Sequence, residues 1–411
     1  MDFQRGQKAA WLAASLTGLV DVDLLLSKIL ANARQVVRAE AGTVYLVNQG
    51  KLRFQTSQND YLERLIGETE DLPFVGSNLD IDSNTLAGYA ALQGRILTVN
   101  DTEAIDFDAP FQHLISIDAS TQYPCRAIMS IPLIASNDIL LGVLQLINPT
   151  DGEGQICDFD RGDEAVLANY AKSVSTALER AIMLRDSIIN SLKLVELHDQ
   201  TETTSHAQRI ALLTTAIYKS WAHKRQVPQA EMDGVLNVLP LAAMLHDVGK
   251  AWIPTHILNK PGRLNKEERQ VMEHHVALGA KLYADSKTHL DRLVFQIITD
   301  HHERWDGLGY PGLKADGEPA DAEPPAGPEA GAPGRGKKGE EISIFGRILA
   351  VADVFDALSS RKAYKEPFDE SLAVQIMVQE SGRHFDPSVI EAFLSVRPLL
   401  GKIRARYPEA E

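Results

Sequence analysis

The first third of the chain alternates between helical and strand-like patterns of apolar residues. Residues 20–37 place apolar side chains three and four positions apart, which predicts an amphipathic helix. Residues 42–47 and 52–56 are rich in β-branched and aromatic residues and predict a strand pair. Residues 127–134 and 139–147 predict a second, more apolar pair. A helix followed by antiparallel strands and further helices indicates an α+β domain built on one central antiparallel sheet.

A long, uninterrupted helix is predicted next. Residues 163–197 contain no proline or glycine, and apolar side chains recur there every seven positions, at Leu167, Val174, Ala181, Ile188 and Val195. Heptad spacing is typical of a coiled-coil seam. We therefore interpret residues 166–199 as a connecting signalling helix through which the protein forms a homodimer. The alternative is that the stripe packs against its own domain.

The remainder of the chain is helical in pattern, with one exception. Residues 315–340 combine five prolines with glycine, alanine and charged residues, a composition that predicts a surface loop inserted in the domain. The expected organisation is an α+β domain over residues 1–165, the linker helix over 166–199 and an all-α helical bundle over 200–400. Residues 401–411 are expected to form a C-terminal tail.

Composition excludes several classes of partner and site. The net charge of −15 argues against a nucleic-acid polymer held by a broad basic surface. Two cysteines, Cys125 and Cys157, are too few for a disulfide framework or a thiolate metal site. The chain has no apolar run long enough to span a membrane, and its first residues lack a secretory pattern, so we expect a cytoplasmic protein without a membrane partner. Ten of the 12 histidines follow residue 200, which indicates chemistry in the second half.

Histidines and carboxylates gather at the ends of predicted apolar helices. His246-Asp247 ends the apolar run 238–245, and His301-His302 follows the run 293–298. Glu202 and His206 are four residues apart, which places both on one helix face. The candidate ligands are five histidines and three carboxylates: Glu202, His206, His246, Asp247, His275, His301, His302 and Asp353.

Taken together, these ligands predict a site for several metal ions. Each histidine alone is more often hydrogen-bonded in a core than bound to a metal. Histidine combined with carboxylate, without cysteine, favours iron, manganese or a similar ion over structural zinc. Eight ligands are too many for one divalent ion and enough for two or three. A site for more than one metal ion is therefore the simplest interpretation of these residues.

The same residues resemble a known family. Residues 244–250, Met-Leu-His-Asp-Val-Gly-Lys, are similar to the HD signature of the HD-GYP phosphodiesterases, and residues 301–311 match its HHExxDGxGYP element at every defined position. The resemblance extends over residues 200–395. Further matches are Lys260-Pro-Gly262, His275-Val-Ala-Leu-Gly279, Ala352-Asp-Val-Phe-Asp-Ala-Leu358 and His384-Phe-Asp-Pro387.

The resemblance implies a metal-dependent hydrolase that cuts cyclic di-GMP to pGpG, GMP or both. It implies that the eight candidate ligands bind the metals, with His246, Asp247 and Lys250 carrying catalysis. Lys250 and Tyr310 are expected to contact substrate, as is Lys365. One departure is that Arg361-Lys-Ala-Tyr364 replaces the family's Asp-Arg-Pro-Tyr, so that Lys362 would stand in for an arginine contact. Glu303 and Asp306 are expected to support the Gly-Tyr-Pro turn or a metal-bound histidine.

The first domain resembles a GAF domain. The matching stretches are residues 41–46, 84–88, 129–133 and 142–148. The resemblance implies a sensor that binds a small molecule or mediates dimerisation. The cyclic-nucleotide-binding members carry an Asn-Lys-Phe-Asp-Glu set, which is matched here except that Pro149 stands at the lysine position, and this loss weakens the prediction of a cyclic nucleotide. The matching residues are Asn148, Phe159, Asp163 and Glu164.

Three other functions stay open. The substrate could be another cyclic dinucleotide such as cyclic GMP-AMP, because base recognition lies outside these motifs. An HD-type nucleotidase or (p)ppGpp hydrolase is disfavoured by the complete Gly-Tyr-Pro element. A non-hydrolytic cyclic di-GMP receptor is disfavoured because no candidate ligand is lost. In each case we expect regulation to pass from the sensor through the linker helix to Glu202 and His206, which follow it directly.

Overall fold

The computed structural model describes residues 2–61, 78–106, 108–111, 123–199, 203–285, 287–312, 336–360 and 367–408. The chain divides into two compact units, Met1–Leu184 and Arg185–Glu411. Two domains were expected from the sequence, and the fold class predicted for each is confirmed below. No helix in the described part of the chain combines the length and apolar character needed to cross a membrane.

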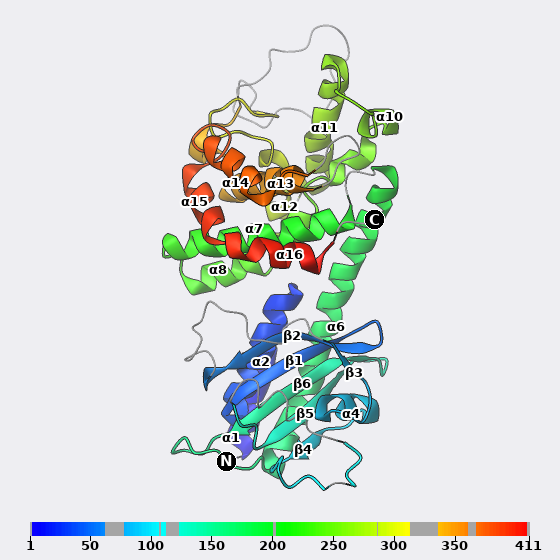
Figure 1. Cartoon of the computed structure of the whole chain (residues 1–411), viewed down its shortest axis with the longest axis vertical. Coiled ribbons are helices and arrows are strands. Elements are labelled where there is room, and N and C mark those ends of the chain that lie inside the picture. The colour runs from blue at the N-terminus through cyan, green and yellow to red at the C-terminus, as the bar shows by residue number, and fades with distance from the viewer. Residues whose placement is uncertain are drawn as a thin grey trace. The chain divides into compact units, whose positions relative to one another are not determined.

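The first unit is built on a six-stranded antiparallel sheet with the strand order β3-β2-β1-β6-β5-β4 (Figure 1). Both strand pairs expected from the sequence are present, and β1 also pairs with β6. The strands are β1 (Ala39–Asn48), β2 (Lys51–Asn59), β3 (Asn78–Asp80), β4 (Leu97–Val99), β5 (Ile128–Ile134) and β6 (Leu140–Pro149).

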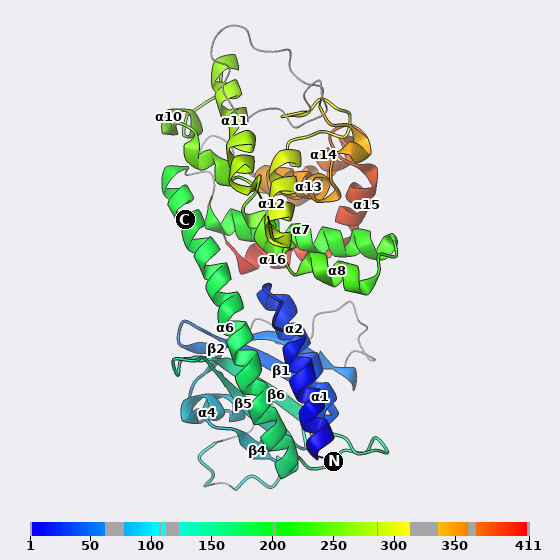
Figure 2. The ribbon, with the colours of Figure 1, turned by 180° about the vertical axis from the view of Figure 1, so that it is seen from behind.

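Helices cover both faces of this sheet. On one face lie α1 (Asp2–Ala14), α2 (Val22–Val37) and the first part of α6 (Arg161–His198), as Figure 2 shows. The opposite face carries α4 (Leu86–Gln93), which packs on β5 and β6. Side chains alternate between the two faces along a strand, so that Val44 points to the larger core while Tyr45 points to the α4 side.

Helix α6 runs uninterrupted across the division between the two units. Its heptad positions Leu167, Val174 and Ala181 are almost fully buried in the core of the first unit. Over these three positions the stripe therefore packs against its own domain, and the expectation of a free coiled-coil seam is wrong there. Ile188 and Val195, in the second unit, are half-buried. The homodimer stays a prediction.

In the described residues of the second unit, the regular elements are all helices, joined by turns and loops. Helix α7 packs against α9, α13 and α15, and α12 packs against α9, α11 and α13, so these helices form the centre of the bundle (Figure 1). The helices are α7 (Thr204–Lys224), α8 (Gln229–Leu236), α9 (Leu239–Met244), η1 (Val248–Trp252), α10 (Thr255–Leu258), α11 (Lys266–Tyr283), α12 (His289–Asp300), η2 (Gly339–Glu341), α13 (Ile344–Ser359), α14 (Glu370–Gln379), α15 (Pro387–Ser395), η3 (Arg397–Leu399) and α16 (Leu400–Arg406).

The structure bears on two further expected segments, the C-terminal tail and the proline-rich insertion. The segment expected as a tail is helical as far as Arg406, and α16 packs against α7, so it is part of the bundle. Of the predicted insertion, residues 336–340 lie in the described part and lead into η2, whereas residues 315–335 lie outside the described residues.

Candidate metal centre

Seven of the eight predicted ligands lie in two adjacent groups in the second unit. The first group is Asp247, His275, His301 and His302, whose ligand atoms all lie within 4.8 Å of one another. The second group is His206, His246 and Asp353, which meet the same limit. The ring centroids of His246 and His301 are 5.4 Å apart and connect the groups. The eighth, Glu202, lies outside the described residues.

Close packing of two backbone segments positions the first group. The buried helix α9 ends at Met244, and the chain then turns through His246 and Asp247 into η1. A Cβ atom on Gly249 would meet the carbonyl oxygen of His275 at 1.9 Å. Only glycine permits this approach, so the Gly in the His-Asp-Val-Gly-Lys sequence holds the Asp247 turn against the helix that carries His275.

Backbone carbonyls orient three of the histidine rings. The Nδ1 atom of His246 lies 2.9 Å from the carbonyl oxygen of Ala243, and that of His275 lies 2.7 Å from that of Met272. His301 Nδ1 is 3.0 Å from the carbonyl oxygen of Ile298. A carbonyl can only accept, so each Nδ1 donates and each Nε2 is left as the acceptor that a metal ion requires.

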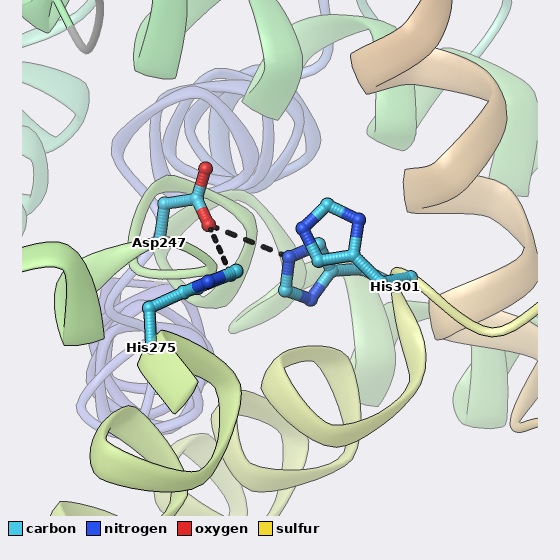
Figure 3. Close-up of side chains that lie close together, drawn as sticks. Asp247, His275 and His301 are labelled. Carbon is cyan, nitrogen blue, oxygen red and sulfur yellow. Dashed lines mark ion pairs between the residues drawn. The ribbon is translucent and has the colours of Figure 1, made fainter. Parts of the chain in front are cut away.

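The Asp247 carboxylate lies at the centre of the first group (Figure 3). Its Oδ1 is 3.1 Å from His275 Nε2 and 3.4 Å from His301 Nε2. Its Oδ2 is 3.2 Å from His246 Nε2 and 2.8 Å from Lys250 Nζ. Burial alone would raise the pKa of Asp247, but the Lys250 ammonium outweighs it and holds the pKa of this carboxyl well below its usual range.

The first group has the properties of a metal site. The Nε2 atoms of His275 and His301 and the Oδ1 of Asp247 are buried, and they form no hydrogen bond of good geometry within the described residues. Buried acceptors that converge without donors are costly, and a cation would satisfy all three at once. Burial, together with His301 and His275, holds the pKa of His302 well below its usual value. The neutral ring that results is the form that binds metals.

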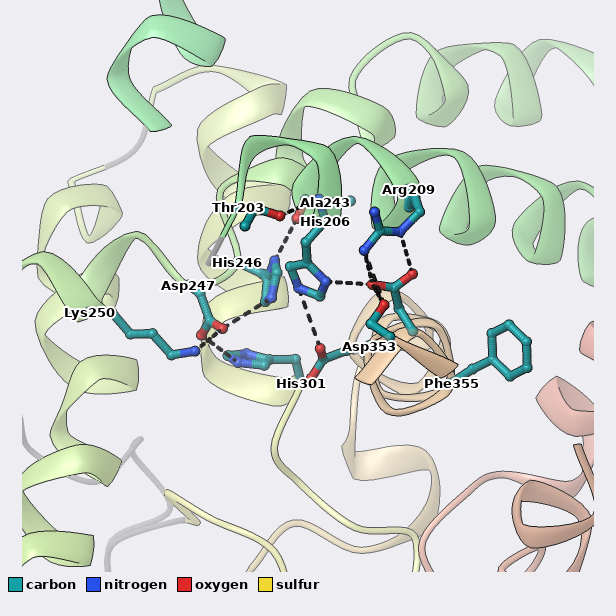
Figure 4. A network of polar contacts seen from close by, with 12 residues as sticks. Thr203, His206, Arg209, Ala243, His246, Asp247, Lys250, His301, Asp353 and Phe355 are labelled. Carbon is teal, nitrogen blue, oxygen red and sulfur yellow. Dashed lines mark hydrogen bonds and ion pairs between the residues drawn. The ribbon is translucent and has the colours of Figure 1, made fainter. Parts of the chain in front are cut away.

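In the second group, the ring of His206 is oriented by the carboxylate of Asp356. Figure 4 shows His206 near Asp353 and Arg209. His206 Nε2 faces Asp353 Oδ1 at 3.7 Å, and His206 Nδ1 lies 2.8 Å from Asp356 Oδ2. Arg209 donates to both oxygens of Asp356, at 2.7 and 2.8 Å. Burial would raise the pKa of Asp356, but hydrogen bonds from Arg209 and His206 lower it. Such a carboxylate–histidine pair fixes the ring orientation of a metal ligand.

Asp356 and Arg209 were not assigned roles from the sequence. Each lies three residues after a candidate ligand on the same helix, Asp356 after Asp353 on α13 and Arg209 after His206 on α7. That spacing puts each pair on one helix face and is the signal that could have found them.

The Gly-Tyr-Pro turn closes one side of the first group. The Tyr310 ring stacks on His302 with centroids 4.6 Å apart, and the Tyr310 N–H donates to the His302 carbonyl at 3.2 Å. Asp306 accepts from the Leu308 N–H within the turn at 3.1 Å. Glu303 accepts from the backbone N–H of Gly312 at 2.7 Å and of Lys337 at 3.0 Å, and burial raises its pKa to about 7. Both acidic residues therefore support the turn, as expected.

The predicted substrate contacts are only partly described. Lys250 and Tyr310 lie against the first group. Lys362 and Lys365 lie outside the described residues. Their roles stay predictions.

Comparison with protein families identifies both units. Two HD-domain models match residues 203–358 and 329–389, and a GAF-domain model matches residues 21–178. The chain carries a GAF domain followed by an HD domain. The resemblance inferred from the sequence motifs is confirmed for both domains.

Relatives of the HD domain are phosphodiesterases by name. The chain is 35% identical over 255 residues to the 3'3'-cGAMP-specific phosphodiesterase 2 of Vibrio cholerae, covering 60% of this chain and 42% of the relative. It is 34% identical over 255 residues to a cyclic di-GMP phosphodiesterase of the same organism, covering 61% and 47%. It is 34% identical over 210 residues to the cyclic di-GMP phosphodiesterase of Thermotoga maritima, covering 51% and 48%. The chain spans less than half the length of each of these relatives.

In the GAF domain, the residues that match the cyclic-nucleotide set have structural partners. Asn148 is fully buried, and its Oδ1 accepts from the N–H groups of Arg126 and Ala127. Its Nδ2 donates to the Tyr123 hydroxyl and the Pro124 carbonyl. Phe159 lies in the core. Asp163 exchanges hydrogen bonds with Asp160 at the start of α6 and forms an ion pair with Arg5 at 2.9 Å.

Proposed function

We propose that the HD domain hydrolyses the 3'–5' phosphodiester bonds of a cyclic dinucleotide, cyclic di-GMP first among them, and releases pGpG, GMP or both. The observation that carries the proposal is the pair of adjacent ligand groups around Asp247, with buried acceptor atoms aimed at one another. The names of the HD-domain relatives support the same substrate class.

The proposed cofactors are two divalent ions, iron or manganese, with a third if Glu202 contributes. His275, His301, His302 and Asp247 would hold one ion, and His206, His246 and Asp353 another. When bound, the ions supply a water activated near neutral pH and neutralise charge on the phosphoryl oxygens. Asp247 contacts members of both groups, one oxygen facing His275 and the other facing His246, so it is the natural bridging ligand.

The protein's own groups supply positioning and charge. Lys250 lies at the edge of the first group and would hold a fixed positive charge against a non-bridging phosphate oxygen. Tyr310, stacked on His302, would form the wall against which the substrate is oriented. Asp356 keeps His206 in one tautomer and one orientation, with Nε2 facing Asp353, so that His206 would be ready to bind a metal ion together with Asp353.

A direct test is turnover of cyclic di-GMP by the full chain loaded separately with Fe(II) and Mn(II). A variant with both His246→Ala and Asp247→Ala is the control. Metal-dependent formation of pGpG or GMP that disappears in the control supports the proposal. Tight binding of cyclic di-GMP without turnover would show instead a receptor.

A second substrate deserves a parallel assay. The first relative described above is named as specific for 3'3'-cGAMP and is as similar to this chain as those named for cyclic di-GMP. Equal concentrations of the two dinucleotides in competition give the ratio of kcat/KM, which identifies the preferred substrate. The GAF domain would regulate this activity through a small-molecule ligand, and the chain would act as a homodimer joined through α6; both are part of the proposal.

A further inference from the structure

The end of α6 belongs to the same compact unit as the metal centre. Its last turn makes polar contacts through two side chains, Glu196 and His198. Glu196 contacts the first residue of a helix that carries a candidate metal ligand, and His198 contacts the segment that follows the His246-Asp247 turn.

His198 is joined to the segment that follows the His246-Asp247 turn. Its Nε2 donates to the Ile253 carbonyl at 2.9 Å, and its Nδ1 lies 3.4 Å from the Thr255 hydroxyl. Its own carbonyl accepts from Asn259 Nδ2 at 3.1 Å. A neutral ring protonated at Nε2 satisfies both ring contacts, because the carbonyl accepts and the hydroxyl donates.

Ile253 in turn is linked to the metal centre through η1. The Ile253 N–H donates to the Lys250 carbonyl at 2.9 Å, and the Lys250 N–H donates to the Asp247 carbonyl at 2.9 Å. The Ile253 side chain is buried in a small cluster with Met272 and Leu278 of α11, the helix that carries His275. Through Ile253, His198 is therefore connected both to the turn that carries Asp247 and to α11, which carries His275.

Glu196 is joined to the helix that carries the second group. Its Oε2 accepts from the backbone N–H of Thr204 at 3.1 Å and from its hydroxyl at 2.7 Å. Thr204 is the first residue of α7, and His206 lies two residues further along. One turn of α6 thus contacts the supports of both ligand groups.

We propose that His198 and Glu196 are positioning residues that couple the register of α6 to the relative placement of the two ligand groups. The inference rests on the proposed function of the same site. Hydrogen bonds of this length weaken within a few tenths of an ångström, whereas one residue of helix register corresponds to about 1.5 Å of translation. A shift or rotation of α6 must therefore either move η1 and α7 or break these bonds.

The first test measures hydrogen exchange in the full-length, metal-free protein. His198→Leu removes the donor to Ile253, His198→Gln keeps a donor at the same distance along the side chain, and Lys193→Ala is a control on an exposed position of the same helix. We expect amides of residues 248–258 to exchange about fivefold faster in His198→Leu, the size of one net hydrogen bond. His198→Gln and Lys193→Ala should resemble the wild type. Unchanged exchange in His198→Leu would overturn the proposal.

The second test measures Mn(II) affinity by titration. His198→Leu should weaken binding about 10-fold or more, in the range found for residues that support metal ligands. Glu196→Leu should weaken it as well and speed exchange at the start of α7 instead of η1. Unchanged affinity in both variants would overturn the coupling. A wild-type chain that binds no Mn(II) would refute the proposed function, while the exchange measurement still decides whether the end of α6 positions η1.

Discussion

The GAF and HD domains each contain a buried cluster of polar side chains, but the two clusters are completed differently. Around Asn148 in the GAF domain, both ends of the amide have protein partners: two backbone N–H groups, a hydroxyl and a carbonyl. In the HD domain, the Oδ1 atom of Asp247 faces the Nε2 atoms of His275 and His301, and all three atoms are hydrogen-bond acceptors. None of the three has a hydrogen bond of good geometry in the described part of the chain.

This difference separates a structural polar cluster from a ligand site. A buried network that satisfies every member stabilises one conformation and needs nothing else. A network of converging acceptors costs stability until a cation completes it. The Asn148 side chain, which matches a cyclic-nucleotide motif, therefore has a structural role in this domain.

The sharpest way to test the contrast is to remove the carboxylate at the centre of the HD cluster. Asp247→Asn should lower kcat/KM by about 1000-fold or more, because a ligand facing both groups and its negative charge are lost together. Bound metal should fall in parallel. Steady-state turnover and metal analysis measure both, with Asp285→Asn, an exposed carboxylate near the end of α11, as the matched control. Full metal content in Asp247→Asn would contradict the assignment.

The carboxylate behind His206 should have a smaller effect. Asp356→Asn is expected to lower Mn(II) affinity about 10- to 100-fold, because His206 loses the partner that fixes its orientation. It also leaves Arg209 buried without its ion pair, which should lower the free energy of unfolding by about 3 kcal/mol or more. Glu391→Gln, in an exposed ion pair with Lys224, is the control. A variant that loses stability but keeps wild-type metal affinity would restrict Asp356 to a structural role.

The GAF cluster should respond in stability alone. Asn148→Leu leaves the N–H groups of Arg126 and Ala127 without their acceptor and puts a branched side chain at a φ of 53°. We expect a loss of about 2–4 kcal/mol in the unfolding free energy of the GAF domain, with metal content of the HD domain unchanged. Denaturant unfolding and metal analysis of the full chain test this, beside Asn137→Leu in an exposed turn. A drop in metal content would show that the two clusters are coupled.

The smallest expected effect is a pH dependence of the metal-free HD domain. Because the pKa of His302 is lowered in the folded state, the unfolded chain binds a proton first as the pH falls through about 6.5. The unfolded state then carries more protons, so stability falls with falling pH, by up to about 1.4 kcal/mol per pH unit for this group. His302→Gln should flatten that slope between pH 6.5 and 5. Bound Mn(II) should leave the slope at least as steep, because it keeps the ligand rings unprotonated in the folded state while the unfolded chain still takes up protons.

Much of the HD site could be predicted because four of its ligands directly follow apolar helices in a recognisable order. His246, Asp247, His301 and His302 needed no knowledge of packing. The supporting pair Asp356 and Arg209 was missed because an aspartate or arginine on a helix is usually solvated, and only the packing of α7 against α13 brings them together. The spacing of residues predicts which side chains share one face of a helix, but not which other helix packs against that face.

For the linker helix, local spacing predicted the wrong packing partner for part of the stripe. On a straight helix, positions seven residues apart rotate by only about 20° per heptad around the helix axis. Leu167, Val174 and Ala181 can therefore face either a partner helix in a coiled coil or the core of their own domain. The deciding information is the sheet against which they pack, which is formed by residues far away in the sequence. Residues 401–406 were assigned to a tail for a related reason: the one residue of α16 that is buried, Leu400, precedes them, so they carry no apolar pattern to recognise.

Glu303 has a consequence for engineering of this chain. Its carboxylate holds the backbone on both sides of the proline-rich insertion, at Gly312 and at Lys337. Two points separated by 25 positions in the sequence are therefore fastened to one side chain next to the Gly-Tyr-Pro turn. A fluorescent reporter or an affinity tag inserted between these two points is therefore expected to leave the backbone at Gly312 and Lys337 in place as long as Glu303 is kept, and retained metal content after the insertion would check this.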